Sequence, residues 1–188
     1  ISCHAKGIYH LIPTARTIID IGGQDAKAIQ LDGKGNILKF VMNDKCAAGT
    51  GRFLEMMART MEMSLDDMGK AGLSYKEDIT ISSMCTVFAE SEVVSLIAQN
   101  KATDDIVHGL NKAVASKTAA LAKRVGGEER YMMTGGVSKN QGLVKTLEEK
   151  LGTTLVISDK AQLCGALGAA LFAKDMVCLL YTSPSPRD

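Results

Sequence analysis

The sequence lacks tryptophan, has three prolines and an aromatic content of only 4%, so its core must be built from Ala, Val, Leu, Ile and ten Met. No apolar run approaches the length of a membrane-spanning helix. Charges of the two signs nearly cancel, and a formal net charge of +1 provides no general attraction for nucleic acid or for an anionic membrane. We therefore expect neither a nucleic acid nor a membrane among the partners of this protein.

The pattern of a secreted disulfide framework is missing as well. The chain of 188 residues carries five cysteines, an odd number without close spacing. We therefore expect a reducing, cytoplasmic environment. No signal peptide is visible, and the chain opens Ile-Ser-Cys-His without an initiator Met, as a fragment that has lost its start would.

Two of the cysteines stand just before predicted helices. Cys46 is followed by Gly49-Thr50-Gly51 and a helical pattern, and Cys85 directly precedes another helical pattern. The N-terminus of a helix carries partial positive charge and free N–H donors, which favour a thiolate over a thiol. Such a thiolate is a nucleophile or a ligand for a soft metal centre. Two thiolates are too few for a four-cysteine site, so a symmetric dimer would have to supply the other pair.

The region after residue 16 predicts three short strands joined by two turns. The strands are expected at 17–21, 26–31 and 37–42, and the turns at 22–25 and 32–36. Asp20 ends the first strand and faces Gly22 and Gly23. Taken alone, the glycines are explained as hairpin turns. The neighbouring carboxylate favours a phosphate site instead, because glycines allow backbone N–H groups to approach a phosphate, and a carboxylate can hold Mg²⁺ or orient a water molecule.

The remaining pattern predicts helices with two further strands. Helices are expected at 51–63, 64–70, 86–99, 103–125, 139–150 and 161–173, and strands at 130–133 and 153–157. The alternation of strand and helix in the last third argues for an α/β layer with parallel strands. At the turn between strand and helix, Thr134-Gly135-Gly136-Val137-Ser138-Lys139-Asn140 is a second place where the backbone can approach a ligand, although in isolation an ordinary tight loop is the favoured explanation.

Apolar spacing assigns faces to some of these helices. In the helix at 51–63 we expect a core stripe of Phe53, Met56, Met57 and Met61. In the helix at 86–99 we expect a buried face of Val87, Val94, Ile97 and Ala98. His108 lies alone inside a long helix and is assigned no role.

Four segments, taken together, resemble one family. They read DIGGQDAK at 20–27, NDKCAAGTGRF at 43–53, SMCTVFAESEV at 83–93 and TGGVSKN at 134–140. In combination they resemble the activator components of 2-hydroxyacyl-CoA dehydratases and the related ATP-binding subunits of benzoyl-CoA reductase, over roughly residues 1–174. The resemblance implies an α/β, actin/hexokinase-like (ribonuclease H-like) ATPase fold that is incomplete at the N-terminus.

The same resemblance implies a division of the chain and a set of site residues. Residues 1–16 would end an N-terminal lobe, 17–175 would form the C-terminal nucleotide- and cluster-binding lobe, and 176–188 a tail outside the fold, of read-through or cloning origin. The implied catalytic residues are Asp20 and Gln24. The implied nucleotide-binding residues are Gly22, Gly23, Gly49, Thr50, Gly51, Gly135, Gly136, Val137 and Asn140, and the implied cluster ligands are Cys46 and Cys85. Cys164 is expected to be a core thiol, beside a small-residue helix at 165–171 that permits close packing.

The implied function is ATP-dependent donation of one electron to a 2-hydroxyacyl-CoA dehydratase. A homodimer would share one 4Fe–4S cluster, bind ATP or ADP with Mg²⁺, and take electrons from reduced ferredoxin or flavodoxin. The first phosphate-binding loop of the family has no counterpart here, so the chain by itself is expected to hydrolyse ATP poorly.

Several alternatives remain open at the level of sequence. The chain could be the ATP-binding subunit of a benzoyl-CoA reductase-type enzyme, or a cluster-free, actin-like kinase fragment whose cysteines are small buried residues. A four-thiolate dimer site would suit structural zinc as well as iron and sulfur. A non-catalytic interaction protein is the remaining alternative.

Overall fold

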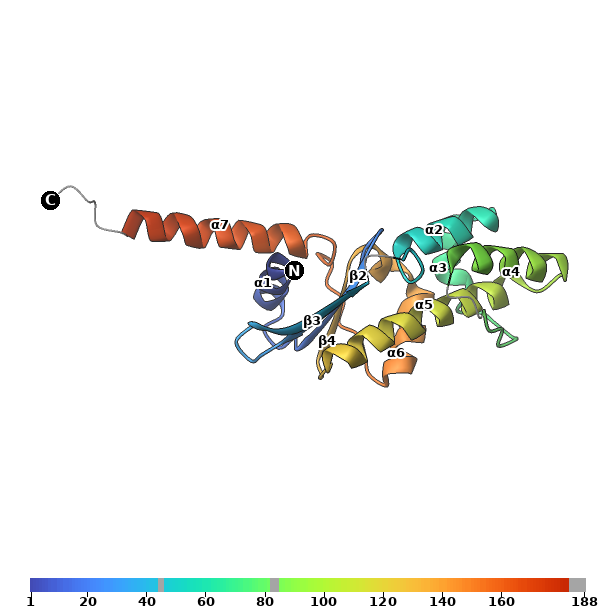
Figure 1. Ribbon diagram of the computed structural model, residues 1–188, viewed down its shortest axis with the longest axis horizontal. Coiled ribbons are helices and arrows are strands. Elements are labelled where there is room, and N and C mark those ends of the chain that lie inside the picture. Colours follow the sequence, from blue (N-terminus) through green and yellow to red (C-terminus); the bar gives the residue numbers. More distant parts are fainter. Residues whose placement is uncertain (44–45, 82–84, 183–188) are drawn as a thin grey trace.

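The computed structural model describes residues 1–43, 46–81 and 85–182, which form strands and helices (Figure 1). In chain order they are α1 (Ser2–Leu11), β1 (Thr17–Ile21), β2 (Ala26–Leu31), β3 (Ile37–Asn43), α2 (Gly51–Thr60), α3 (Leu65–Ala71), α4 (Thr86–Ala98), α5 (Thr103–Val125), β4 (Tyr131–Thr134), the 3-10 helix η1 (Gly136–Lys139), α6 (Gln141–Leu151) and α7 (Cys164–Thr182). No helix in this described part is long and apolar enough to cross a bilayer.

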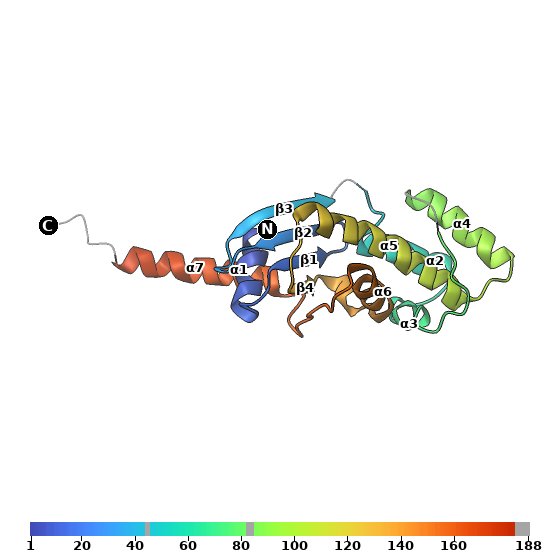
Figure 2. The ribbon, with the colours of Figure 1, turned by 90° about the horizontal axis from the view of Figure 1, so that it is seen from below.

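The sheet has the strand order β3-β2-β1-β4 (Figure 2). β1, β2 and β3 form the predicted antiparallel meander, and β4 pairs with β1 in parallel, as predicted for the α/β layer. Asp32 organises the second turn because its Oδ1 accepts the N–H groups of Lys34 and Asn36, each at 2.8 Å. Gly35 completes that turn at φ +81°, a conformation that L side chains rarely adopt.

Alternating side chains of the sheet enter two separate cores. On one face, Ile19 and Ile21 of β1 belong to the larger core, which α5 and α6 complete. On the other face, Ile18 and Ile29 pack with Ile8 of α1 and with the buried Cys164 at the start of α7. The sheet is therefore a central layer with α5 and α6 on one side and α1 and α7 on the other (Figures 1 and 2).

Helices α1 and α7 pack backbone to backbone through two glycines. A Cβ built on Gly7 would overlap the carbonyl oxygen of Cys164, and a Cβ on Gly168 would overlap that of Cys3. The predicted close packing of the small-residue helix is confirmed, and so is the prediction that Cys164 is a core thiol. Burial raises the pKa of this thiol, so it stays protonated.

Several predicted element boundaries are wrong. The strand expected at 153–157 is reduced to one bridge between Val156 and Met132, and the adjacent N–H of Leu155 donates to Glu148 Oε1 at 2.7 Å. The last helix begins at Cys164 rather than at residue 161 and continues through Thr182, because no Gly or Pro interrupts residues 169–182. The division of the chain at residues 16 and 176 stays a prediction. Three smaller differences remain. The helix α1 was not predicted from sequence patterns, α2 ends at Thr60 rather than at residue 63, and the 3-10 helix η1 precedes α6.

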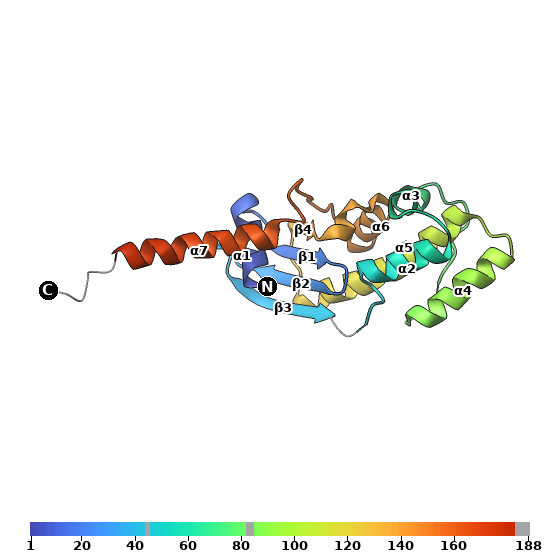
Figure 3. The ribbon, with the colours of Figure 1, turned by 90° about the horizontal axis from the view of Figure 1, so that it is seen from above.

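Helix α4 is oriented differently from the prediction. Its buried side chains are Thr86, Ala89 and Val93, which face α2 and α5. The predicted face is largely exposed, at 63% for Val87, 52% for Val94 and 43% for Ile97, and Phe88 beside it is 69% exposed. The helix is apolar almost all round, so periodicity could not decide which side packs inward. Figure 3 shows α4 at the margin of the molecule. The exposed fractions show that its apolar side is uncovered in the single chain. The Met stripe of α2 does face the core, as predicted.

The contact between α1 and α7 gives a first prediction. Gly168→Ala should lower the free energy of unfolding by about 1–3 kcal/mol, the usual cost of overpacking, even though Ala favours a helix. Urea titration measures this. The matched control is Ala169→Leu, a larger addition at an exposed position of the same helix, which should change stability by less than about 0.5 kcal/mol. Equal stability of both variants would contradict the close packing.

Candidate functional site

The turn between β1 and β2 is joined directly to the first turn of α2. The N–H groups of Gly51 and Arg52 donate to the carbonyl oxygens of Gly22 and Gly23, each at 2.8 Å. A Cβ on Gly51 would lie 3.0 Å from the Gly22 oxygen and 3.2 Å from Val137 Cγ2, so only glycine allows this approach. Two of the predicted phosphate segments are therefore one connected structure.

The third glycine segment packs against the end of β1. Gly135 has φ +85°, and a Cβ there would overlap the carbonyl group of Ile21. The next residues form η1, and Asn140 then caps α6 by accepting the N–H of Leu143 at 2.9 Å. This local geometry brings TGGVSKN beside the β1–β2 turn, although more than a hundred residues separate the two in sequence.

A cavity of about 340 Å³ lies where these three segments meet. Six predicted nucleotide-binding residues line it, namely Gly22, Gly23, Gly51, Gly136, Val137 and Asn140. The remaining lining residues are Arg52, Leu54 and Glu55 of α2, Leu65 and Asp66 of α3, Lys139, and Gln162. Sequence reasoning missed these seven, although Arg52 and Lys139 could have been suspected from their places beside glycine motifs.

The other predicted nucleotide residues lie outside the lining of this cavity. Thr50 is fully buried, and its Oγ1 donates to the carbonyl oxygen of Ala47 at 2.6 Å. Gly49 adopts φ +94° beside Lys117. Both residues shape the turn that leads into α2. Gln24 is exposed at the edge of the β1–β2 turn, and Gly135 supports the cavity from behind.

Asp20 is a buried carboxylate with a full set of partners. Its Oδ2 lies 2.6 Å from Lys27 Nζ, its Oδ1 accepts Thr134 Oγ1 at 2.8 Å, and Oδ1 lies 3.5 Å from Nε2 of His4. Burial alone would raise the pKa of Asp20, but hydrogen bonds from these partners outweigh it and hold that pKa well below its usual range.

Lys27 links Asp20 to a second carboxylate. Its Nζ lies 2.9 Å from Asp25 Oδ2, and although burial opposes it, the two carboxylates raise the pKa of this amine above its usual value. Lys27 stands directly opposite Asp20 in the β1–β2 register. A lone lysine inside a largely apolar strand was the sequence signal for this pair, and sequence reasoning passed over it.

The two predicted ligand cysteines are both exposed. Cys85 is the N-cap of α4, as expected, whereas Cys46 lies four residues before Thr50, the N-cap of α2. Cys46 opens onto a second cavity of about 440 Å³, whose basic lining residues are Lys117 and Arg124 of α5. Within the described residues, no group of three or more Cys, His, Asp or Glu side chains could hold a metal ion. The assignment of Cys46 and Cys85 as cluster ligands stays a prediction.

Comparison with known proteins places the chain among ATPases. Residues 1–173 match the model of the BadF/BadG/BcrA/BcrD ATPase family. The activator of lactoyl-CoA dehydratase from Anaerotignum propionicum is 56% identical over 92% of this chain and 67% of its own length. One of the subunits of benzoyl-CoA reductase from Thauera aromatica is 33% identical over 90% of this chain and 62% of its own length. The chain thus spans about two thirds of the length of these relatives.

Solved structures agree with this placement. The activator of the 2-hydroxyisocaproyl-CoA dehydratase from Clostridium difficile, with bound ADPNP, superimposes with a TM-score of 0.92 at 45% identity, over the whole of this chain and 70% of that one. Xylulose kinase from Bifidobacterium adolescentis superimposes with a TM-score of 0.59 at 14% identity, over 90% of this chain and 38% of that one, a likeness of fold alone. The predicted actin/hexokinase-like fold is confirmed.

The buried pair gives a prediction about pH. Because the pKa of Asp20 is depressed in the folded state, its contribution to stability is present above the unfolded pKa of about 4 and is lost as the pH falls below it. Asp20→Asn should cost on the order of 3 kcal/mol at pH 7 and should flatten the loss of stability between pH 5 and 3. Urea titrations across this range measure both effects.

The matched control for this experiment is Asp159→Asn, which neutralises an exposed carboxylate. It should leave both the stability at pH 7 and the acid slope nearly unchanged. An acid slope of Asp20→Asn identical to that of the native chain would contradict the pairing.

Proposed function

The chain belongs to the BadF/BadG/BcrA/BcrD ATPase family, and on that premise we propose that it forms the larger part of an ATP-dependent activator of a 2-hydroxyacyl-CoA dehydratase. The observation that carries this proposal is the convergence of three glycine segments on one cavity, in a chain that superimposes on an ADPNP-bound activator. The relatives also favour it, since the activator relative is 56% identical and the benzoyl-CoA reductase relative 33%. A reductase component remains the second candidate.

The cavity suits the phosphates of a nucleotide. The first amides of α2 are occupied by the carbonyl groups of Gly22 and Gly23, so this helix N-terminus does not offer them to a phosphate. The open side is at Gly23, where a Cβ would meet nothing within 4 Å, and the cationic side chains are those of Arg52 and Lys139. We propose that phosphates lie against the Gly23 backbone between these two cations.

We keep Asp20 and Gln24 as the proposed catalytic residues, with Mg²⁺ accompanying ATP. Asp20 is the last residue but one of β1, two positions before the cavity-lining Gly22, and a Cβ on Gly135 would lie 3.1 Å from its Oδ1. Its Oδ2 is bonded to Lys27, so this ionised carboxylate would take a divalent cation in exchange for that partner. Gln24 is exposed on the same turn and is able to orient water.

The exposed thiols of Cys46 and Cys85 fit a cluster shared between two copies of the chain. Helix α4 begins at Cys85 and presents the uncovered apolar side of Val87, Phe88, Val94 and Ile97, which a second copy would bury. The positive end of α4, and Lys117 and Arg124 beside Cys46, favour an anionic centre there. A 4Fe–4S cluster, when bound, would accept one electron from reduced ferredoxin or flavodoxin and pass it to the dehydratase in the cytoplasm.

A short covalent path joins the proposed nucleotide site to Cys46. The β1–β2 turn is hydrogen-bonded to Gly51 and Arg52, and Cys46 lies just upstream of the Gly49-Thr50-Gly51 turn. A shift of Gly22 and Gly23 on nucleotide binding would therefore move the start of α2 and the segment that carries Cys46. Coupling of this kind requires only that the nucleotide prefers one of two arrangements.

The phosphate site is tested by comparing a substitution that fills the cavity with one that disturbs the packing around it. Gly23→Ala should weaken binding of ADPNP by about tenfold, equivalent to 1.4 kcal/mol, and should leave the thermal midpoint unchanged. Gly51→Ala, which crowds Gly22 and Val137, should lower the midpoint instead. Isothermal titration calorimetry and thermal unfolding of the purified protein measure the two effects. Undiminished ADPNP affinity in Gly23→Ala would contradict the placement of the phosphates.

The cluster is tested by metal analysis. Protein purified without oxygen should be brown, dimeric and oxygen-sensitive, and Cys46→Ser or Cys85→Ser should abolish the iron signal. The matched control is Cys178→Ser, which alters another exposed cysteine and should retain the iron. Colourless protein with stoichiometric zinc would favour a structural zinc dimer, and a monomer without metal would favour a cluster-free kinase fragment.

A further inference from the structure

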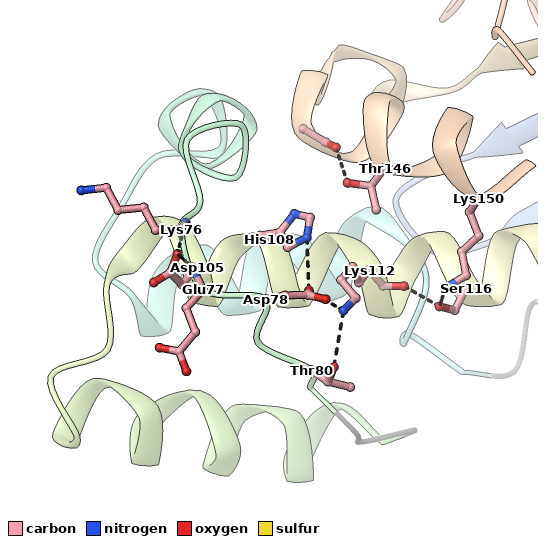
Figure 4. Close-up of polar contacts among 11 residues, drawn as sticks. Lys76, Glu77, Asp78, Thr80, Asp105, His108, Lys112, Ser116, Thr146 and Lys150 are labelled. Carbon is pink, nitrogen blue, oxygen red and sulfur yellow. Dashed lines mark hydrogen bonds and ion pairs between the residues drawn. The ribbon is translucent and has the colours of Figure 1, made fainter. Parts of the chain in front are cut away.

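The segment that leads towards Cys85 is fastened along helix α5. Residues 75–81, which we call the strap, follow α3 and have no helix or strand of their own. Upstream, α3 contributes Leu65 and Asp66 to the proposed nucleotide cavity. Downstream, the chain reaches Cys85 at the start of α4. Figure 4 shows side chains of the strap and of α5 facing one another.

The first fastening is a carboxylate that binds two backbone amides. Asp105 Oδ1 accepts the N–H groups of Lys76 and Glu77, at 2.7 Å and 3.0 Å (Figure 4). Asp105 is only 5% exposed, and these two hydrogen bonds lower its pKa below the usual range. Charge-assisted hydrogen bonds to the strap backbone fix the position of the strap along α5 more firmly than contacts between mobile side chains would.

The second fastening is a stack of two rings. The rings of Tyr75 and His108 lie 3.5 Å apart and within 6° of parallel. His108 is 5% exposed, and burial lowers its pKa although Asp78, 3.6 Å from its Nε2, opposes that shift. Asp78 is also bonded to Lys112 at 2.5 Å, one turn further along α5 (Figure 4). His108, to which the sequence assigned no role, is therefore held between Tyr75 and Asp78 of the strap.

The third fastening is a close approach that only glycine permits. A Cβ on Gly109 of α5 would lie 3.0 Å from the carbonyl oxygen of Ile79 and 3.3 Å from Ile81 Cγ1. The side chains of Ile79 and Ile81 are buried in the larger core. The strap therefore lies directly on the α5 backbone at this point, rather than over a layer of side chains.

Helix α5 also borders the segment that carries the other cysteine. Its Lys117, Thr118 and Leu121 line the cavity onto which Cys46 opens. One continuous helix of 23 residues, Thr103–Val125, thus contacts the strap near its start and the Cys46 segment nearer its end.

We propose that α5 is the strut that sets the position of Cys85 relative to Cys46, with Asp105, His108 and Gly109 as its positioning residues. This inference rests on the proposed function for its purpose, because a shared cluster needs its thiolates at fixed separations. It also names a second path from the nucleotide cavity, through α3 and the strap, which ends at Cys85. The fastenings themselves are independent of whether a metal is bound.

The test measures the local opening of the strap in metal-free, reduced protein. Asp105→Ala should raise the hydrogen exchange of the Lys76 and Glu77 amides by about tenfold, because two charge-assisted hydrogen bonds are lost. Because Cys85 is exposed in the native chain, its position is followed instead by the distribution of distances between spin labels on Cys46 and Cys85, which should broaden. Mass spectrometry resolves the exchange rates, and pulsed electron paramagnetic resonance measures the distances. The amides of residues 46–50 serve as the internal reference, and their exchange should not change.

Three further variants separate positioning from loss of folding. Asp104→Ala removes the same charge from the same helical turn, but its carboxylate accepts neither strap amide, so the exchange rates and the label distances should stay as in the native chain. Asp105→Asn retains an acceptor oxygen and should restore most of the protection. Gly109→Ala favours the helix yet displaces Ile79, so it should again accelerate exchange of the strap amides alone and broaden the label distances.

The outcomes for the strap and for the cluster are distinguishable. If Asp105→Ala accelerates exchange of the strap and of residues 46–50 equally, or leaves the distances between the labels on Cys46 and Cys85 unchanged, the strut is disproved. If the strap alone is accelerated, the distances broaden and the anaerobic native protein contains no iron, the strut stands and the proposed cluster falls. If the native protein contains iron, Asp105→Ala should also alter the electron paramagnetic resonance spectrum of the reduced protein, whereas Asp104→Ala should not.

Discussion

The site depends on backbone approaching backbone without intervening side chains. Gly51 meets the oxygen of Gly22, and Gly135 meets the carbonyl of Ile21, at separations that leave no room for a Cβ. These contacts bring the ends of β1, α2 and η1 into one place, and the cavity is the space that remains between them. Since hydrogen bonds also join Gly51 and Arg52 to Gly22 and Gly23, a ligand that moves the β1–β2 turn must move the start of α2 as well.

The buried charges near the site are also closely paired. Asp20 and Lys27 face each other across β1 and β2, and Thr134 and His4 supply the remaining hydrogen-bonding contacts from β4 and α1. The two strands that flank β1, namely β2 and β4, are thereby both joined to the same carboxylate. Burial makes an unpaired charge strongly destabilising, so these contacts also specify how α1 sits against the sheet. A conformational change that moved α1 away from the sheet would have to replace the contact between His4 and Asp20.

Much of the fold could be predicted from the sequence, because local signals dominate it. The meander follows from β-branched runs between turns. The strand expected at 153–157 is reduced to a single bridge, and the N–H of Leu155 beside it donates to the side chain of Glu148 in α6, a contact that no strand pattern indicates. The prediction of the buried face of α4 failed because apolar side chains occur on almost every side of that helix.

The site was predictable in part for a similar reason. Glycine motifs indicated six lining residues, whereas Asp66 and Gln162 reach the cavity only through tertiary packing. The strap was invisible in the sequence, since Tyr75 and His108 belong to different elements and no local pattern relates them. The exposure of Cys46 and Cys85 agrees with their assignment as ligands, while the assignment itself remains a prediction.

The parallel pairing of β1 with β4 has a kinetic consequence. Asp20 and Thr134, which touch across these strands, are separated by 114 positions, while the three-stranded meander needs only neighbouring residues. Closing so long a loop is entropically costly, so the meander can assemble early and the β4 edge only after α2 to α5 have condensed. Until then β1 has an open parallel edge, where nascent chains are vulnerable to pairing with one another.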